Sequence, residues 1–265
     1  MKPFFTVVNF SGIYEKESFY QLDKGSSFCG EVLDLKGVSG TNCMCDDEAK
    51  KEIKARIKAY INKEDVPFVD LKDFAGSVHF IDSGNYHYMS ALLLDMVKEP
   101  FSLVVLDHHP DMQPPMFGDI LSCGGWVLNV LENNPYVRDV HVIGADRELI
   151  SKLDKEIQSK AKFYDLEDIF DAETGNIKLP ETEHPVYLSI DKDVIARDEL
   201  VTNWDQGQAR WEDVTSFTRR ILSDRKVIGV DICGECAPDQ EDCDVALETE
   251  GNDEFNKDIL EYIYM

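Results

Sequence analysis

The amino-acid sequence predicts an α/β fold, a single three-layer domain over residues 1–265 built on a mostly parallel, doubly wound sheet. Two observations support this prediction. Short runs rich in β-branched residues alternate along the chain with longer stretches of helical periodicity, as in successive strand–helix–strand units. Several of the short runs are apolar throughout, which is typical of strands buried on both faces of a parallel sheet.

The predicted strands and helices follow one another without an internal repeat or a linker. We expect strands at Phe4–Asn9, Val78–Asp82, Leu103–Asp107, His141–Ile143, Val186–Asp191 and Lys226–Asp231. We expect helices at Asp46–Ile61, Tyr88–Val97, Leu149–Ser159 and Trp211–Leu222. The first helix has apolar residues at helical spacing, such as Ile53 and Ile57, and the second is stopped by Glu99-Pro100. An α/β chain of this length commonly stays a single domain.

The chain is strongly acidic. It has 27 Lys and Arg against 52 Asp and Glu, a formal net charge of −25, so we expect no binding to nucleic acid or to anionic membranes. No apolar run approaches the length of a membrane span, and the first residues lack the features of a signal peptide. We therefore expect a soluble, cytoplasmic protein. The acidic segment Pro238–Asp253 is predicted to be solvated surface.

The cysteines favour reduced thiols. There are 7 of them, and an odd number without a secretory signal argues against a disulfide framework. Cys233 and Cys236 form a CxxC, which is also compatible with redox or zinc chemistry. No second CxxC or suitably spaced Cys/His pair completes a zinc set, so ordinary reduced cysteines are the preferred interpretation.

Acidic and imidazole side chains gather where predicted strands end. Asp107, His109 and Asp111 follow one apolar run, and Asp191 and Asp193 follow another. Open parallel sheets carry functional groups at the carboxyl ends of their strands, and alternate residues of an extended chain share a face. Carboxylates brought together in this way require a counter-charge. The negative charge of four aspartates is enough to balance two divalent ions. Carboxylate and imidazole donors without a thiolate favour manganese, or iron or cobalt, over structural zinc.

Four segments, in order and at fitting spacing, resemble motifs of one known family. Asp107–Asp111 resembles the Asp-x-His-x-Asp motif of the ureohydrolases, which include arginase, agmatinase and formimidoylglutamase, and Ser189–Asp193 resembles their Ser-x-Asp-x-Asp motif. Gly84–Ser90 is similar to the earlier Gly-Gly-Asp-His-Ser stretch. Asp231 with Glu235–Pro238 is similar to the late Asp-Ile-x-Glu-x-Asn-Pro segment. The resemblance covers roughly residues 78–240 and implies the fold shared by arginases and deacetylases.

The resemblance implies two manganese ions per chain. One would be held by His87, Asp107, Asp111 and Asp191, and the other by Asp107, His109, Asp191 and Asp193, with Asp107 and Asp191 bridging. Two such ions lower the pKa of a shared water for attack on the trigonal carbon of a guanidinium or amidine. Glu235 would pair with the cationic substrate group through charge-assisted hydrogen bonds. Asp107, Asp191 and Glu235 are thus the expected catalytic residues.

The sequence departs from the family where a proton-transfer histidine is expected. That histidine normally lies a dozen or so residues after Asp-x-His-x-Asp, and Gly118–Trp126 contains none. Either Ser122 or Cys123 stands in for it, or the leaving group is protonated differently, or the reaction differs.

Two further departures concern the substrate side of the site. Glu235 lies one residue further from Asp231 than in the family pattern. The segment Asn203–Gly207 replaces a glycine-rich stretch and is either a plain turn or part of the pocket wall. In the second case Trp204 joins Glu235 and Ser122 as an expected substrate-binding residue.

The sequence therefore predicts a manganese-dependent hydrolase that cleaves a C–N bond of a small guanidino or amidine compound, as arginase and agmatinase do. Two alternatives stay open: a deacetylase-like amidohydrolase with one zinc, and a non-catalytic metal-binding protein. Retention of Asp111 and Asp193 favours two metals over one. The expected partner is a small cationic substrate, and a homo-oligomer is compatible with the trimers and hexamers common in the family. His79, His108 and His141 are expected to be structural.

Overall fold

The protein folds around one parallel sheet. The structure is a computed structural model that describes residues 3–22, 26–171 and 174–264. Within these residues, eight strands lie in the order β2-β1-β4-β10-β9-β5-β7-β8, and each neighbouring pair is parallel. They are β1 (Phe4–Asn9), β2 (Cys29–Asp34), β4 (Val78–Ser83), β5 (Phe101–Leu106), β7 (Val137–Ile143), β8 (Lys162–Tyr164), β9 (Val186–Asp191) and β10 (Val227–Glu235). The predicted parallel α/β sheet is confirmed.

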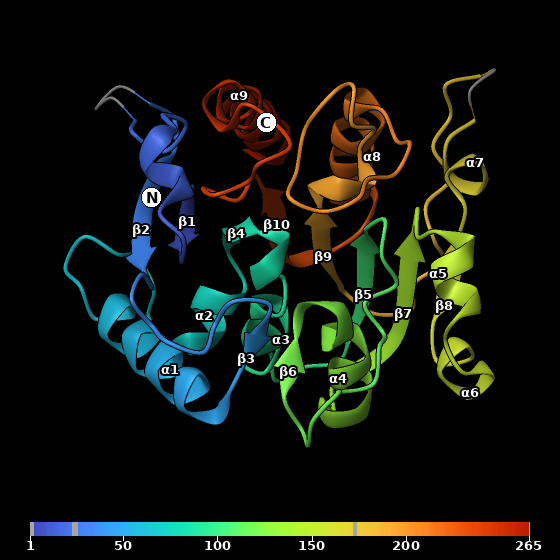
Figure 1. Ribbon diagram of the computed structural model, residues 1–265, viewed down its shortest axis with the longest axis horizontal. Coiled ribbons are helices and arrows are strands. Elements are labelled where there is room, and N and C mark those ends of the chain that lie inside the picture. Colours follow the sequence, from blue (N-terminus) through green and yellow to red (C-terminus); the bar gives the residue numbers. More distant parts are fainter. Residues whose placement is uncertain (1–2, 23–25, 172–173, 265) are drawn as a thin grey trace.

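Helices cover both faces of the sheet and make the fold three-layered (Figure 1). One face carries α1 (Asp47–Ile61), α2 (Leu71–Ala75), α3 (Met89–Leu94), α4 (Trp126–Asn133), α5 (Arg147–Ser151) and α6 (Lys155–Gln158). The other carries α7 (Leu166–Ile169), α8 (Trp211–Asp224) and α9 (Val245–Tyr264). Within the described residues, none of these helices offers a stretch long and apolar enough to cross a membrane.

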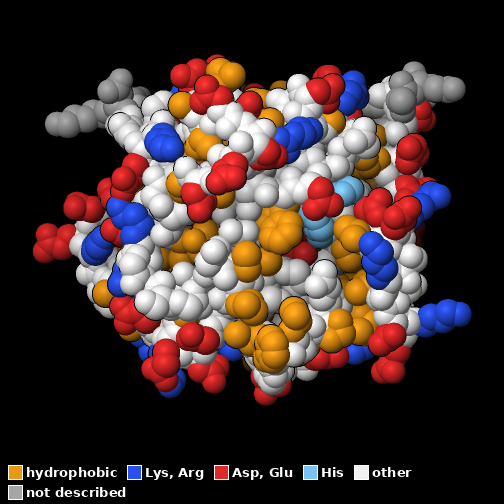
Figure 2. Space-filling model, in the orientation of Figure 1, with side chains coloured by type: hydrophobic (Ala, Val, Ile, Leu, Met, Phe, Trp, Pro, Cys, Tyr) orange, Lys and Arg blue, Asp and Glu red, His pale blue; other side chains and the backbone are white. Residues whose placement is uncertain are grey.

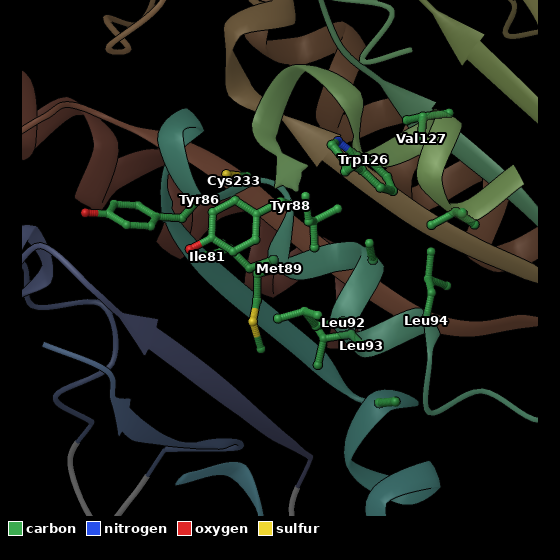
Figure 3. Packing of buried hydrophobic residues seen from close by; sticks show 14 of the residues in the cluster. Ile81, Tyr86, Tyr88, Met89, Leu92, Leu93, Leu94, Trp126, Val127 and Cys233 are labelled. Atoms are coloured by element: carbon green, nitrogen blue, oxygen red, sulfur yellow. The ribbon is translucent and has the colours of Figure 1, made fainter. Parts of the chain in front are cut away.

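An apolar cluster fills the space between each face of the sheet and its helices. Figure 3 shows part of the first cluster, in which Ile81 and Cys233 of the sheet lie with Met89 of α3 and Trp126 of α4. The second cluster includes Phe217 of α8. Strands β5 and β9 are buried along their whole length between the two clusters, which explains their continuously apolar sequences.

Most predicted elements lie where the sequence placed them. β1 and β9 have the predicted bounds, and the other predicted strands differ at their ends. The predicted helix Leu149–Ser159 is instead two short helices, α5 and α6, because the backbone leaves helical geometry at Asp154, with ψ of 144°. The edge strands β2 and β8 have no continuous apolar run, and the sequence pattern does not predict them.

The prediction that Pro238–Asp253 is solvated surface is wrong in its second part. From Val245 onward this segment belongs to helix α9, and Asn252 within it is fully buried. Asp253 is 9% exposed, and its Oδ1 accepts hydrogen bonds from the backbone N–H groups of Ser18 at 2.8 Å and Phe19 at 2.6 Å. This acidic residue therefore joins the C-terminal helix to the N-terminal part of the chain.

The strand order determines where a site can form. β4, β10, β9 and β5 are neighbours at the centre of the sheet, so the segments that follow them meet at one edge. A short antiparallel pair, β3 (Met44–Cys45) with β6 (Leu121–Ser122), lies beside this edge.

Candidate metal centre

Three aspartates surround one histidine at the carboxyl edge of the sheet. His87 follows β4 and a short 3-10 turn, and its Nδ1 lies 3.3 Å from Asp107 Oδ2, 3.3 Å from Asp111 Oδ2 and 3.2 Å from Asp191 Oδ2. Asp107 follows β5 and Asp191 ends β9, so three strands deliver these groups. All four side chains are buried. The structure brings together the four residues expected around one ion.

Neighbouring side chains hold the His87 ring in place. Its Nε2 lies 2.9 Å from Ser189 Oγ, and its ring centroid lies 4.8 Å from that of Trp126. Trp126 Nε1 in turn donates a hydrogen bond of 2.7 Å to Asp111 Oδ2. A hydrogen bond at the far nitrogen is the usual support of a metal-binding imidazole, since it orients the ring. Nδ1 is left facing the carboxylates.

A second group forms around His109. Its Nδ1 lies 2.8 Å from Asp193 Oδ2 and 3.6 Å from Asp107 Oδ1, and its Nε2 lies 3.2 Å from Asp205 Oδ1. Asp107 therefore belongs to both groups, with one carboxylate oxygen directed toward each histidine. The potential ligand atoms of His87, Asp107 and Asp111 lie within 4.8 Å of one another, and so do those of Asp107, His109 and Asp193, so each set is close enough to share one ion.

Turns, rather than an extended chain, make these carboxylates converge. The prediction that Asp107, His109 and Asp111 share one face of an extended segment is wrong. Asp111 has a left-handed φ of 48°, and Asp107 Oδ1 accepts a 2.5 Å hydrogen bond from the backbone N–H of His109. After β9, Asp191 Oδ1 accepts a 3.0 Å hydrogen bond from the backbone N–H of Asp193 and starts a 3-10 turn. Each turn sends the last aspartate of its motif to a different histidine.

The buried carboxylates lack sufficient counter-charge from the protein. Burial, and then the charge of Asp107, raises the pKa of Asp111 to about 7. Burial and the charge of Asp191 raise the pKa of Asp193 well above its ordinary value. In the described part of the chain, His87 Nδ1 and Asp107 Oδ2 are buried without a hydrogen-bond partner, which is uncommon in native proteins. Two divalent cations would satisfy these atoms and balance the charge, so the residues present fit a two-metal centre.

Cys233 is a neighbour of the first group that the sequence analysis did not include. Its Sγ lies close enough to His87 and Asp191 to share an ion with them. Burial raises the pKa of this thiol well above its ordinary value, and it donates to the Ser83 carbonyl oxygen at 3.4 Å. Since the thiolate is the ligand form of cysteine, the carboxylates and imidazoles remain the metal-binding set. Cys236, the other cysteine of the CxxC, lies outside the group.

A cleft with a volume of about 240 Å³ opens over the two groups. Ser122 and Trp204, the predicted substrate contacts, both line it, and so does Cys123. Lining residues that the sequence analysis missed come from β3 and the loop before β6, among them Met44 and Met116. The pairing of β3 with β6 joins distant parts of the chain through strands of two residues, so no local pattern could have indicated this wall.

The structure corrects the predicted placement of Glu235. Its side chain is 1% exposed and does not line the cleft; Oε1 lies 2.6 Å from Lys192 Nζ and 2.8 Å from Asn256 Nδ2. The family glutamate would align one residue earlier, at Gly234. Gly234 has a φ of 103°, and a Cβ there would lie 2.5 Å from Asp191 Oδ1. No side chain fits at that position, and Glu235 instead forms a buried ion pair behind the metal-binding groups.

The remaining conspicuous histidines lie outside both groups. His79 is buried, with Nδ1 3.0 Å from Asp231 Oδ1, and His141 is buried between neighbouring polar side chains. His108 is partly buried, and its Nε2 lies 3.8 Å from Asp205 Oδ2. These positions agree with the structural roles expected for the three residues.

Comparison with other sequences gives a relative but no assigned family. No protein-family model matches the chain. An uncharacterised protein of Thermotoga maritima is 29% identical over 238 residues, which are 89% of this chain and 81% of that protein.

Comparison with solved structures shows which fold this is. Formimidoylglutamase from Bacillus subtilis matches with a TM-score of 0.65 at 12% identity, over 100% of this chain and 88% of that one. Arginase from Bacillus caldovelox matches with a TM-score of 0.62 at 13% identity, over 100% and 98%. A triple mutant of an arginase-like protein from T. brucei, bound with Mn²⁺, matches with 0.60 at 16% identity, over 100% and 92%. The chain has the arginase-like α/β fold.

Proposed function

We propose that this chain is a divergent member of the ureohydrolase family, a hydrolase that uses two divalent metal ions to cleave a C–N bond of a small guanidino or amidine compound. One observation carries the proposal: His87 and His109 face four aspartates, and one of these, Asp107, is shared between the two groups. The enzymes that share the fold, formimidoylglutamase and arginase, support this choice of reaction.

The two groups would hold two manganese ions. His87, Asp107, Asp111 and Asp191 would hold the first, and Asp107, His109 and Asp193 would hold the second, to which the family resemblance adds Asp191. When bound, such a pair of ions supplies a water of lowered pKa and polarises the substrate. Carboxylate and imidazole donors favour manganese, and Mn²⁺ is the ion bound by the arginase-like mutant from T. brucei.

The residues of the chain contribute orientation and a shaped cleft. Ser189 holds His87, and Asp205 holds His109, each through the ring nitrogen that faces away from the metal-binding carboxylates. The hydrogen bond between the Cys43 and Cys123 thiols, together with burial, raises the pKa of Cys123, so this thiol keeps its proton at neutral pH. In the absence of the family histidine, the Ser122 hydroxyl, which lines the cleft, could relay a proton from water to the departing amine.

Metal content and turnover together test the proposal. Protein loaded with Mn²⁺ and freed of excess metal is expected to retain two ions per chain by elemental analysis. It is expected to hydrolyse at least one guanidino or amidine compound from a panel of arginine, agmatine, guanidinobutyrate, formimidoylglutamate and the uncharged-tail compound butylguanidine. Asp193→Asn should abolish turnover and lower the manganese content, whereas Asp239→Asn, the same change at an exposed aspartate, should alter neither. Full turnover without metal would contradict the proposal.

A deacetylase-like amidohydrolase is the second candidate, and the withdrawal of Glu235 from the cleft favours it. A neutral amide does not require the carboxylate that a guanidinium uses. This alternative predicts one zinc per chain and hydrolysis of an acetylated amine. Two manganese ions per chain, with urea or an amine released from a guanidino or amidine compound, would exclude it.

A further inference from the structure

Beyond its metal-binding residues, the described lining of the cleft contains no acidic or basic side chain other than the thiols of Cys43 and Cys123. Among the described residues that line it, every side chain other than the candidate ligands is apolar, a thiol, an uncharged polar group or absent, as in glycine. The large apolar lining side chains are Met44, Met116, Ile120 and Trp204, and Gln113 is a large uncharged polar one. A substrate bound at the metal-binding groups would extend along these side chains.

One wall of the cleft is a fixed aromatic ring. Trp204 Nε1 donates a 3.0 Å hydrogen bond to Asn85 Oδ1, and Asn203 Oδ1 accepts a 2.8 Å hydrogen bond from the backbone N–H of Gly84. A Cβ at Gly84 would lie 2.6 Å from Trp204 Cδ1, so the glycine permits this close approach. The indole also meets the His109 ring edge to face, with centroids 5.9 Å apart. Trp204 is therefore held as part of the site although its residue is 39% exposed.

Another part of the cleft lining presents methionine side chains. Met44 lies in β3, opposite Ser122 of β6, and is 39% exposed, while Met116 on the preceding loop is 79% exposed. Figure 2 shows hydrophobic side chains gathered around the histidine side chains on this face, over the region where Figure 1 draws β3 and β6. Methionine adapts to irregular apolar shapes, including thioether and aromatic groups.

Among the described residues that line the cleft, none outside the candidate metal ligands has a carboxylate, ammonium or guanidinium group that could pair with a charged substrate tail. Glu235, the residue expected to pair with a cation, lies behind the site and is bonded to Lys192. Asp205 is bonded to His109 Nε2 and is not among the residues that line the cleft. An ammonium or carboxylate placed between apolar walls would lose hydration without gaining a partner.

We infer that the part of the substrate that extends away from the reacting carbon is uncharged and predominantly apolar: an alkyl, thioether or aromatic group. The inference rests on the proposed function, because it assumes that the reacting C–N group lies at the metal-binding residues. It separates this chain from enzymes whose substrates have a charged tail, such as the ammonium of agmatine.

Butylguanidine and agmatine form a matched pair for the test, since agmatine differs by one terminal ammonium. With protein carrying two manganese ions per chain, calorimetric titration should show butylguanidine binding at least tenfold more tightly than agmatine. Lengthening the chain to pentylguanidine should tighten binding by about fourfold, the effect of burying one methylene. If either compound is hydrolysed, the kcat/KM values should follow the same order.

A variant that introduces a charge into the cleft extends the test, and the same kind of change outside the cleft is its control. Met44→Glu should reduce the preference for butylguanidine over agmatine by about tenfold, because it supplies the missing carboxylate. Val69→Glu, the same kind of change at an apolar residue that is 88% exposed and outside the cleft, should leave the preference unchanged. Equal or tighter binding of agmatine by the unaltered protein would overturn the inference, as would binding of neither compound by the manganese-loaded protein. Preferential binding of butylguanidine without hydrolysis of any guanidino or amidine compound would instead reject the proposed reaction and leave the inference standing.

Discussion

Glu235→Gln is expected to lower the free energy of unfolding by about 3–5 kcal/mol, because it leaves Lys192 buried without its counter-charge. The two side chains are 1% and 0% exposed, and Oε1 lies 2.6 Å from Nζ. At that distance the attraction is about 6 kcal/mol for an effective dielectric constant near 20. Asn252 Oδ1, 2.6 Å from Nζ, still accepts a hydrogen bond from the ammonium in the variant and offsets part of the loss.

Urea unfolding of the manganese-saturated protein, followed by circular dichroism, measures this effect with metal linkage held constant. Glu241→Gln is the control, because Glu241 is exposed, and its change in stability should stay within about 0.5 kcal/mol. Replacing both partners, as in Lys192→Met with Glu235→Gln, should recover most of the loss, since no unpaired charge remains. Unchanged stability of Glu235→Gln, combined with a higher KM for a cationic substrate, would refute this reasoning and return Glu235 to the substrate site.

Three further measurements follow from the surroundings of the site. Burial and the charge of Glu235 raise the pKa of Glu17 to about 10, so the folded protein holds a proton that the unfolded chain releases near pH 4–5. The stabilisation from this group is complete below that pH and is lost as the pH rises toward 10. The free energy of unfolding in urea should therefore be lower at about pH 9 than at about pH 6, and Glu17→Gln should reduce this difference. Ser189→Ala removes the hydrogen bond to His87 Nε2 and should weaken manganese binding about 10–100-fold, as measured by competition with a metal-sensitive dye; unchanged affinity would show that ring packing alone orients His87. A hydrogen bond from Cys123 lowers the pKa of Cys43 to about 7, so peptide mapping should find iodoacetamide at Cys43 before Cys45, whose pKa burial raises to about 11.

The metal-binding groups were predictable because they depend on local features of the chain. Asp107 and Asp191 come at the ends of β5 and β9, whose buried, apolar sequences identify them as central strands. Parallel strands carry their carboxyl ends to one edge, so nearness in space followed from the order of short motifs. The direction of each side chain could not be predicted from the sequence, because it depends on turns such as the left-handed backbone at Asp111.

Glu235 was misplaced because its position depends on one backbone angle. The positive φ of Gly234 changes the direction of the residue that follows, and a motif match cannot detect such a change. The similarity of the segment suggested a substrate-binding role for Glu235 although its spacing from Asp231 was one residue too long, and the structure instead pairs Glu235 with the buried Lys192.

Helix α9 was missed for a related reason. Part of its buried face is polar: Asn252 and Asn256 contact the Lys192–Glu235 pair rather than an apolar core. Hydrophobic periodicity cannot distinguish such a face from solvated surface. The polar face of α9 is buried because it contacts the Lys192–Glu235 pair. These partners lie far apart in the sequence, so neither the helix nor the pair could be predicted from its own local sequence.

The net charge of the chain and the lining of the cleft would act on different steps of substrate binding. The formal net charge of −25 attracts cations at long range, but this field acts on the rate of encounter and is screened by salt beyond roughly 10 Å. Within the cleft, two divalent ions would balance the four aspartates, so the site itself would be close to neutral. Retention then depends on short-range contacts with apolar walls such as Trp204 and Met44. The acidity of the chain therefore does not define the charge of the substrate, which we infer instead from the lining of the cleft.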